Sequence, residues 1–110
     1  MNRKYGGLIM AVIYYIGTKD KDTKDYKLTN ESIKRTIMNE FIKEYPLGFT
    51  ITEGIGCYKH NNGEIVTEKT FIVTVLDISF PNHNLIYRLN CELNQECIAV
   101  QVINDSAMFI

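Results

Sequence analysis

The run GFTITEGIGCYKHNNGEIVTEKTFIVTVLDIS, residues 48–79, contains two β-rich stretches that flank a turn at residues 60–63. Within that turn Asn62 and Gly63 tolerate the positive φ of a tight hairpin turn, so the run predicts a two-stranded β-hairpin. Side chains of a strand alternate between its two faces, and one face is apolar on both arms. That face carries Phe49, Ile51, Ile55 and Cys57 on the first arm and Phe71, Val73 and Val75 on the second. We therefore expect one face of the hairpin to be buried.

Upstream of the hairpin, the sequence predicts a strand, a loop and a helix. Residues 8–17, LIMAVIYYIG, are apolar on both faces, as is typical of a central strand. Residues 18–29 alternate lysine with aspartate and show no apolar periodicity, which indicates a loop. Apolar residues then recur at helical spacing over residues 33–44, with Thr29 or Asn30 placed to cap the helix.

Downstream of the hairpin, the pattern predicts a second helix and a last strand. The helix has Ser79 or Asn82 as its N-cap, and its apolar stripe consists of Leu85, Ile86, Leu89 and Leu93. Asn94 is placed to end it, since asparagine accepts the left-handed conformation more readily than most residues. The last strand is predicted at residues 96–104.

The predicted order β-α-β-β-α-β fixes the fold class. Right-handed crossovers turn that order into a four-stranded antiparallel sheet with both helices on one face, the ferredoxin-like α+β fold. The open face would carry Ile13, Tyr15, Ile72 and Leu76, which is more apolar surface than a monomer normally exposes. We therefore expect subunits to pair through this face, and the apolar tail 108–110 to dock on a neighbouring subunit.

Composition limits the classes of function. The chain of 110 residues predicts a single domain, residues 1–110, and a formal net charge of −1 argues against binding of long nucleic acid. The apolar run at residues 8–17 is too short to span a bilayer, so no membrane association is expected. Three cysteines, Cys57, Cys91 and Cys97, are odd in number and form no C-x-x-C pair. They are interpreted as reduced thiols of the core in a cytoplasmic protein.

Catalytic and metal-binding motifs are missing from the sequence. It has no G-x-G-x-x-G, Walker loop, H-x-x-x-H pair or G-x-S-x-G elbow. Neither His60 nor His83 has a second ligand at metal-binding spacing, so we expect no metal and no cofactor. Because no paired general acid and base stands out either, the sequence predicts a protein that is not an enzyme.

The lysine-rich loop has two interpretations, and both place it in water. It is either a solvated surface loop with compensating charges or a phosphate site, in which ammonium groups and backbone N–H groups bind an anion. Glu53 and Glu68 interrupt arms that are otherwise apolar or β-branched. Glu53 either lies where the apolar face of the strand reaches solvent or is held on that face by a binding partner. We favour the first interpretation.

Several short segments, in this order and at these intervals, resemble a family of small phage proteins that includes the Thoeris anti-defence sponges. The segments are Gly17, DKDTK at 20–24, TEGIGCYKH at 52–60 with its Asn-Gly turn, EKT at 68–70, LNQE at 93–96 and AVQ at 99–101. The resemblance covers roughly residues 12–102. It implies a protein of the host bacterial cytoplasm that captures a cyclic nucleotide immune signal without cleaving it and so inhibits Thoeris-type immunity.

The ligand implied by the resemblance is a cyclic ADP-ribose isomer, or a cyclic oligonucleotide, bound between the subunits of a homo-oligomer, from a dimer up to a hexamer. Such a ligand needs cations for its pyrophosphate, an aromatic platform for adenine and amides for polar edges. The candidate ligand-binding residues are Lys19, Lys21, Lys24, Tyr58, Phe80, Arg88, Asn90 and Asn94. Two alternatives stay open, a phage interaction or structural protein without a small ligand and a cofactor-free ferredoxin-like enzyme.

Overall fold

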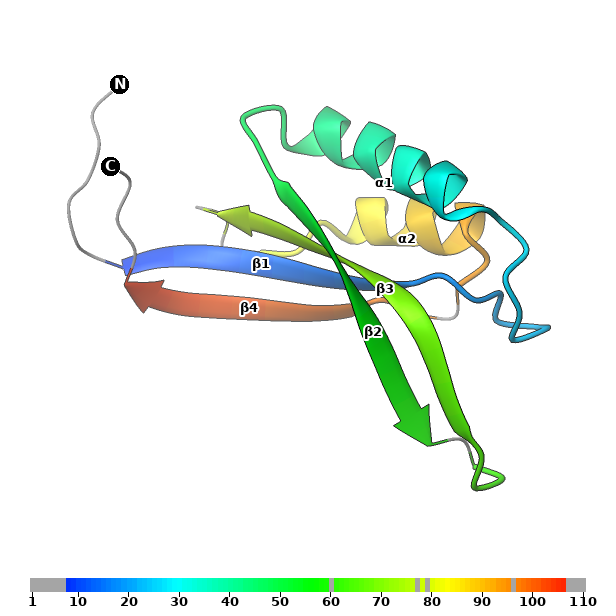
Figure 1. Cartoon of the computed structure of the whole chain (residues 1–110). Coiled ribbons are helices and arrows are strands. Elements are labelled where there is room, and N and C mark those ends of the chain that lie inside the picture. The colour runs from blue at the N-terminus through cyan, green and yellow to red at the C-terminus, as the bar shows by residue number, and fades with distance from the viewer. Residues whose placement is uncertain (1–7, 60, 77, 79, 96, 107–110) are drawn as a thin grey trace.

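A computed structural model describes residues 8–59, 61–76, 78, 80–95 and 97–106 of the chain. Its elements are β1 (Leu8–Gly17), α1 (Asn30–Glu44), β2 (Thr50–Lys59), β3 (Ile65–Leu76), α2 (His83–Glu92) and β4 (Ala99–Ser106). The strands form one antiparallel sheet in the order β2-β3-β1-β4, and both helices cover the same face of it (Figure 1). The predicted ferredoxin-like α+β fold is therefore confirmed.

The core lies between the helices and the covered face of the sheet. Its fully buried side chains include Tyr14 of β1, Phe41 of α1 and Phe71 of β3. The Tyr14 hydroxyl also has hydrogen-bond partners inside the core. It is 2.7 Å from the Tyr45 hydroxyl and accepts a hydrogen bond from the backbone N–H of Asn82 at 3.0 Å. These two contacts join β1 to the end of α1 and the start of α2.

Local capping explains where both helices begin and where the second one ends. The Thr29 hydroxyl accepts the Ser32 N–H at the start of α1, and the Asn82 side chain accepts the Leu85 N–H at the start of α2. Asn94 follows α2 with a φ of 49°, the left-handed conformation predicted for it. Ser79, the other predicted cap of α2, lies outside the described residues.

The hairpin differs from its prediction in two respects. Gly63 has a φ of 88°, but Lys59 pairs with Ile65, so the connection spans residues 60–64 and is not a tight two-residue turn. The buried face is also shorter than expected, since Ile55 is 82% exposed. The reason is that β2 and β3 run on past the helices as a projecting arm (Figure 1).

The cysteines were expected in the core, and this prediction is wrong. Cys57 lies on the projecting arm, Cys91 on the outer side of α2 and Cys97 in the connection to β4, and all three are exposed. Alternation along the strand correctly places Cys57 on the same face as Phe49 and Ile51. It does not show that the helices end before they reach Cys57 and so leave it exposed.

The open face of the sheet is apolar, as predicted. Ile13, Tyr15 and Ile72 are partly exposed on it, and Leu76 is 47% exposed. The last strand begins at Ala99, three positions later than expected, and the tail 108–110 lies outside the described residues. None of the described helices is long and apolar enough to cross a membrane.

Candidate functional site

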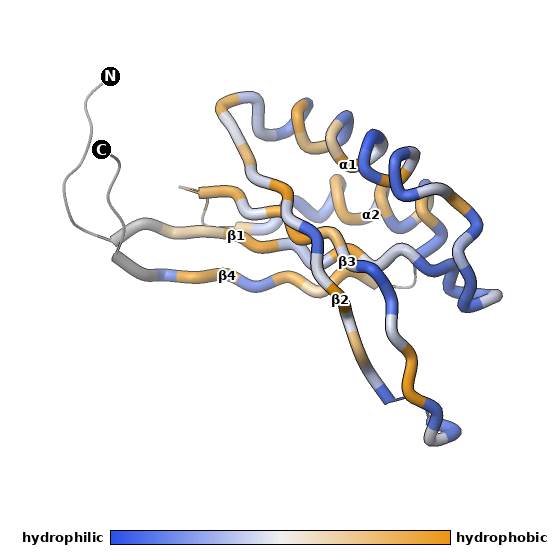
Figure 2. The backbone as a smooth tube through the Cα atoms, in the orientation of Figure 1, coloured by the Kyte–Doolittle hydropathy of each residue, from blue (hydrophilic) through white to orange (hydrophobic). Residues whose placement is uncertain are grey.

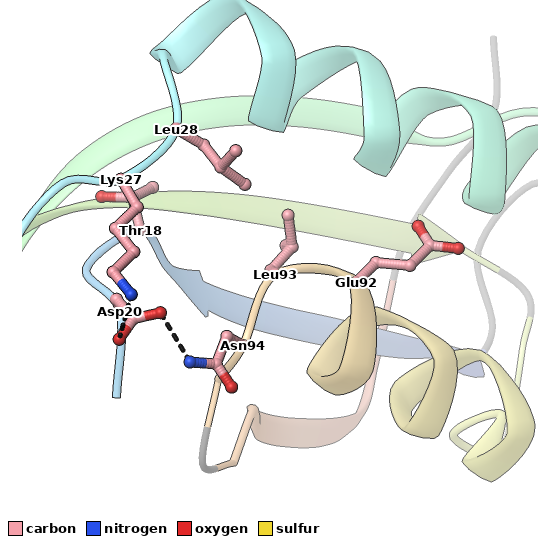
Figure 3. Close-up of a pocket in the computed structure, with 7 residues that line it drawn as sticks. All are labelled: Thr18, Asp20, Lys27, Leu28, Glu92, Leu93 and Asn94. Atoms are coloured by element: carbon pink, nitrogen blue, oxygen red, sulfur yellow. Dashed lines mark hydrogen bonds and ion pairs between the residues drawn. The ribbon is translucent and has the colours of Figure 1, made fainter. Parts of the chain in front are cut away.

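The loop between β1 and α1 is hydrophilic over most of its length (Figure 2), yet it is tied down by one buried carboxylate. Asp20 is only 5% exposed. It accepts hydrogen bonds from the Asn94 amide at 2.5 Å and from the backbone N–H groups of Asp22 and Thr23 at 3.0 and 3.1 Å. Figure 3 shows Asp20 and Asn94 pointing toward each other, so the loop is docked on the end of α2.

These bonds stabilise the charged form of Asp20. The Asn94 hydrogen bond lowers the pKa of the carboxyl group most, the N–H groups of Thr23 and Asp22 add to the effect, and burial opposes it. The resulting pKa is about 2, below the ordinary value of 3.8. Asp20 is therefore an anion at any physiological pH, and Lys27 Nζ lies 3.9 Å from it.

We predict that Asp20→Asn destabilises the protein most near neutral pH. Because the folded-state pKa of about 2 lies below the unfolded value of 3.8, Asp20 stabilises the fold above that value and loses the effect as pH falls through about 4 to 2. Melting curves of both proteins from neutral to acid pH measure this. A difference in Tm that stays constant down to about pH 2 would contradict it.

On its other side, the loop holds a second carboxylate, that of Glu68 on β3. The backbone N–H groups of Thr18 and Lys19 both donate to Glu68 Oε2, at 3.2 and 2.9 Å. The Thr18 hydroxyl also donates to the Lys69 carbonyl at 2.7 Å. Glu68 is thus fixed by the first two residues after β1, while its Oε1 accepts no bond among the described residues.

Glycines on both sides leave room for Glu68. Gly56 is its register partner on β2, and a Cβ at Gly17 would lie 2.5 Å from Glu68 Oε1. Alternation along β3 places Glu68 on the same face as Ile72, which is the open face of the sheet. Tyr58, two positions beyond Gly56 on β2, shares that face and is 44% exposed.

Two cavities adjoin the loop. One of about 180 Å³ lies between the loop and the end of α2, with Leu28 and Leu93 facing it and Asp20 at its edge (Figure 3). The other, of about 400 Å³, is lined by Tyr26, Leu28, Thr29, Asn30 and Lys69. Lys69 follows Glu68 on β3 and so faces the covered side of the sheet, whereas Glu68 faces the open side. The candidate site is therefore the Gly17 end of the sheet, with the cavities on one side of it and Glu68 on the other.

The structure brings four of the predicted ligand-binding residues together at this end. Lys19, Lys21 and Lys24 lie on the loop, and Asn94 lies beneath it. The Lys19 ammonium group is 5.3 Å from the centroid of the Tyr26 ring, whereas Lys21 and Lys24 are exposed. These lysines are available to an anionic group of a ligand.

Of the other predicted residues, Tyr58 shares the face of Glu68, and three lie elsewhere. Phe80 precedes α2 at the opposite end of the sheet and is 78% exposed. Asn90 is partly buried on α2, and its Oδ1 has no partner among the described residues. Arg88 faces α1, where its Nε is 2.8 Å from Glu40 and its Nη2 is 2.9 Å from Glu44. The Arg88 guanidinium therefore joins the two helices.

The sequence drew attention to Glu68 as an interruption of its strand and within the EKT segment of the resemblance, and it gave Gln95 no role beyond its place in the LNQE segment. What marks Glu68 in the sequence is its charge, because it shares a strand face with Val66, Thr70 and Ile72. No sequence pattern indicates the contact that Gln95 makes, since its Nε2 donates to the Lys19 carbonyl at 2.6 Å from 76 residues away along the chain. Among the described residues, no group of three or more His, Cys, Asp and Glu could hold a metal ion.

Comparison with known proteins identifies similar structures but no family. No family model matches the chain, and no curated protein matches its sequence. A phage SAM lyase in the apo state superposes over 99% of this chain and 94% of its own, with a TM-score of 0.63 and 18% identity. A phage SAM lyase in complex with S-methyl-5'-thioadenosine gives the same coverage, with a TM-score of 0.58 and 21% identity.

These likenesses establish that the chain has the fold of a phage protein, which agrees with the broader part of the resemblance found in the sequence. They do not identify a cyclic ADP-ribose sponge. They also correct one expectation, because both similar structures are of an enzyme, whereas the sequence predicted no enzyme. The missing acid–base pair argued only against reactions that need proton transfer by the protein.

Proposed function

We propose that this protein is a phage anti-defence enzyme that binds S-adenosylmethionine (SAM) and cleaves it to S-methyl-5'-thioadenosine. The observation that carries the proposal is the likeness to phage SAM lyase over 99% of the chain. The arrangement around Glu68 supports it, since a fixed carboxylate with one unbonded oxygen suits a cationic substrate.

The charges at the site favour SAM over a pyrophosphate. SAM carries a sulfonium and an ammonium group, and Glu68 supplies an anion with one unbonded oxygen at this end of the sheet. A pyrophosphate needs free cations, but Arg88 is bound to two carboxylates. Of the cations predicted to bind a ligand, the loop lysines remain for it.

The proposed cleavage needs no proton acceptor from the protein. The carboxylate oxygen of SAM attacks its own Cγ, the Cγ–S bond breaks, and its electron pair returns to sulfur. The products are neutral S-methyl-5'-thioadenosine and homoserine lactone, whose ammonium group carries the remaining positive charge. The positive charge at sulfur disappears in the reaction, so an anion placed there would stabilise the substrate more than the transition state. The ammonium charge persists, and Glu68 therefore increases the rate most when it binds the ammonium group and so orients the carboxylate of SAM.

A cyclic ADP-ribose isomer is the second candidate ligand, and capture of that signal would inhibit Thoeris-type immunity in the host cytoplasm. It is supported by the sequence resemblance and by the exposed Lys21 and Lys24 of the loop. Both candidates contain adenosine, so the same aromatic contact could serve either. Tyr58, on the same face as Glu68, is the candidate for that contact.

We further propose that a second copy of the chain covers the open face. Ile72 and Leu76 leave apolar surface there, and Glu68 lies on the same face. A neighbouring subunit would bury this surface and enclose the ligand in a homo-oligomer.

The test is to incubate the purified protein with SAM and to identify products by mass spectrometry, with the oligomeric state measured by sedimentation. We expect S-methyl-5'-thioadenosine and homoserine lactone in equal amounts, and slower turnover by Glu68→Gln. Glu53→Gln, which alters an exposed glutamate on the neighbouring strand, is the matched control. Vinylglycine in place of the lactone would contradict the displacement step but not the cleavage.

Absence of both products would overturn the SAM proposal. Parallel samples with cyclic ADP-ribose isomers then test the second candidate, since a bound ligand raises the Tm by mass action. No rise in Tm with any isomer would exclude these ligands in turn.

A further inference from the structure

Gln95 links the connection between α2 and β4 to Lys19, one of the two residues whose backbone N–H groups hold Glu68. Gln95 is 8% exposed, and its Nε2 donates to the Lys19 carbonyl at 2.6 Å. Its own backbone N–H donates to the Asn90 carbonyl at 3.0 Å, which fixes Gln95 to the last turn of α2. The side chain is therefore a rigid support beneath the loop.

Lys19 is held on both sides of its Cα atom. Its N–H donates to Glu68 Oε2 at 2.9 Å, and its carbonyl accepts from Gln95. The next residues are fixed as well, because Asp20 binds the Asn94 amide and the Lys21 N–H donates to the Asn94 carbonyl at 3.0 Å. Fixing the carbonyl of Lys19 restricts rotation about its Cα–C bond, and with it the direction in which the loop leaves the strand.

We propose that Gln95 is a positioning residue, which aims the Thr18 and Lys19 N–H groups at Glu68 by holding the Lys19 carbonyl. The proposal rests on the proposed function, in which Glu68 binds the substrate. Without the Gln95 amide, the Lys19 carbonyl loses its partner, and the peptide after Lys19 keeps only the bond from the Asp20 N–H to the Asp25 carbonyl, at 2.8 Å, among the described residues. The Glu68 carboxylate then keeps its charge but loses its fixed orientation, and orientation is what an intramolecular displacement requires.

The first measurement needs no substrate. Gln95→Met keeps the length of the side chain and removes only its hydrogen-bonding amide. We expect faster hydrogen exchange at the Thr18 and Lys19 N–H groups in this variant than in the wild type. Asn82→Ala, which removes the cap at the far end of α2, is the control for a general loss of stability. If exchange at both groups rises no more in Gln95→Met than in Asn82→Ala, the proposal is overturned.

The second measurement uses turnover of SAM and a double-mutant cycle. We expect Gln95→Met to lower kcat/KM by roughly tenfold, as is usual for a residue that orients a functional group. In a Glu68→Gln background, Gln95→Met should lower kcat/KM by no more than about twofold, because the carboxylate that Gln95 orients is already lost. Equal losses in both backgrounds would show that Gln95 does not act through Glu68.

The two proposals fail separately. If the wild type does not cleave SAM, the proposed function fails, while faster exchange at Thr18 and Lys19 in Gln95→Met still supports the positioning role. If the wild type cleaves SAM and Gln95→Met equals it in kcat/KM, the positioning role fails and the proposed function stands.

Discussion

Gly17→Ala is expected to reduce SAM cleavage by about a hundredfold while leaving the protein folded, because a displaced functional group costs this much. The added Cβ would lie 2.5 Å from Glu68 Oε1 and 2.8 Å from Glu68 Cδ, closer than atoms can approach. The backbone at Gly17 does not need a left-handed φ, so alanine itself is accommodated. What must move is the carboxylate at the end of the flexible Glu68 side chain.

The measurement is kcat/KM for SAM together with the Tm. Gly54→Ala is the matched control, since its Cβ would meet only the Ile72 side chain, at 3.3 Å, on the same face of the sheet. We expect both variants to melt within a few degrees of the wild type, as the clash at Gly17 falls on a mobile side-chain end. Full activity in a folded Gly17→Ala protein would mean that the observed position of Glu68 is not the one used in cleavage.

Arg88→Leu is expected to lower the Tm by on the order of 10 °C, because it leaves the buried carboxylate of Glu40 with the exposed Lys43 as its remaining cation among the described residues. Glu40 is 5% exposed, and its pKa is lowered chiefly by the Arg88 hydrogen bond. Loss of the guanidinium also removes a partner of Glu44, which keeps the hydrogen bond from the Asn82 amide at 2.9 Å, so the contact between the two helices weakens at two carboxylates.

The double variant Arg88→Leu/Glu40→Leu should recover most of the lost Tm, since an apolar pair can replace a buried ion pair. Lys43→Leu is the control, because Lys43 also contacts Glu40 but is 65% exposed, so its removal should cost little. Equal effects of Arg88→Leu and Lys43→Leu in thermal melts would contradict the structural role. Affinity for cyclic ADP-ribose, measured below the Tm, tests the phosphate role predicted for Arg88.

The fold was predictable because its signals are local. The apolar stripe of α1, the capping residues Thr29 and Asn82 and the left-handed Asn94 are each read within a few residues. Their order then permits few topologies. The exposure of Ile55 was not predictable in this way, because it depends on where the helices stop above the sheet.

The site was less predictable because its parts are distant in the sequence. Lysines in a loop were recognised, but the partners of Arg88 follow from how α1 and α2 pack. The place of Glu68 depends on Gly17 and on two N–H groups that are about fifty residues away along the chain. The lack of a recognisable acid–base pair in the sequence did not exclude an enzyme, since a substrate can supply its own nucleophile.

The pairing of β1 with β4 has a consequence for the synthesis of the protein. Tyr15 pairs with Ala99 and Leu8 with Ser106, so a central strand made early has one neighbour made late. Until β4 leaves the ribosome, the apolar edge of β1 is exposed to other nascent chains. Rapid translation of the codons for β4, or a chaperone bound at that edge, would therefore protect the yield of native protein.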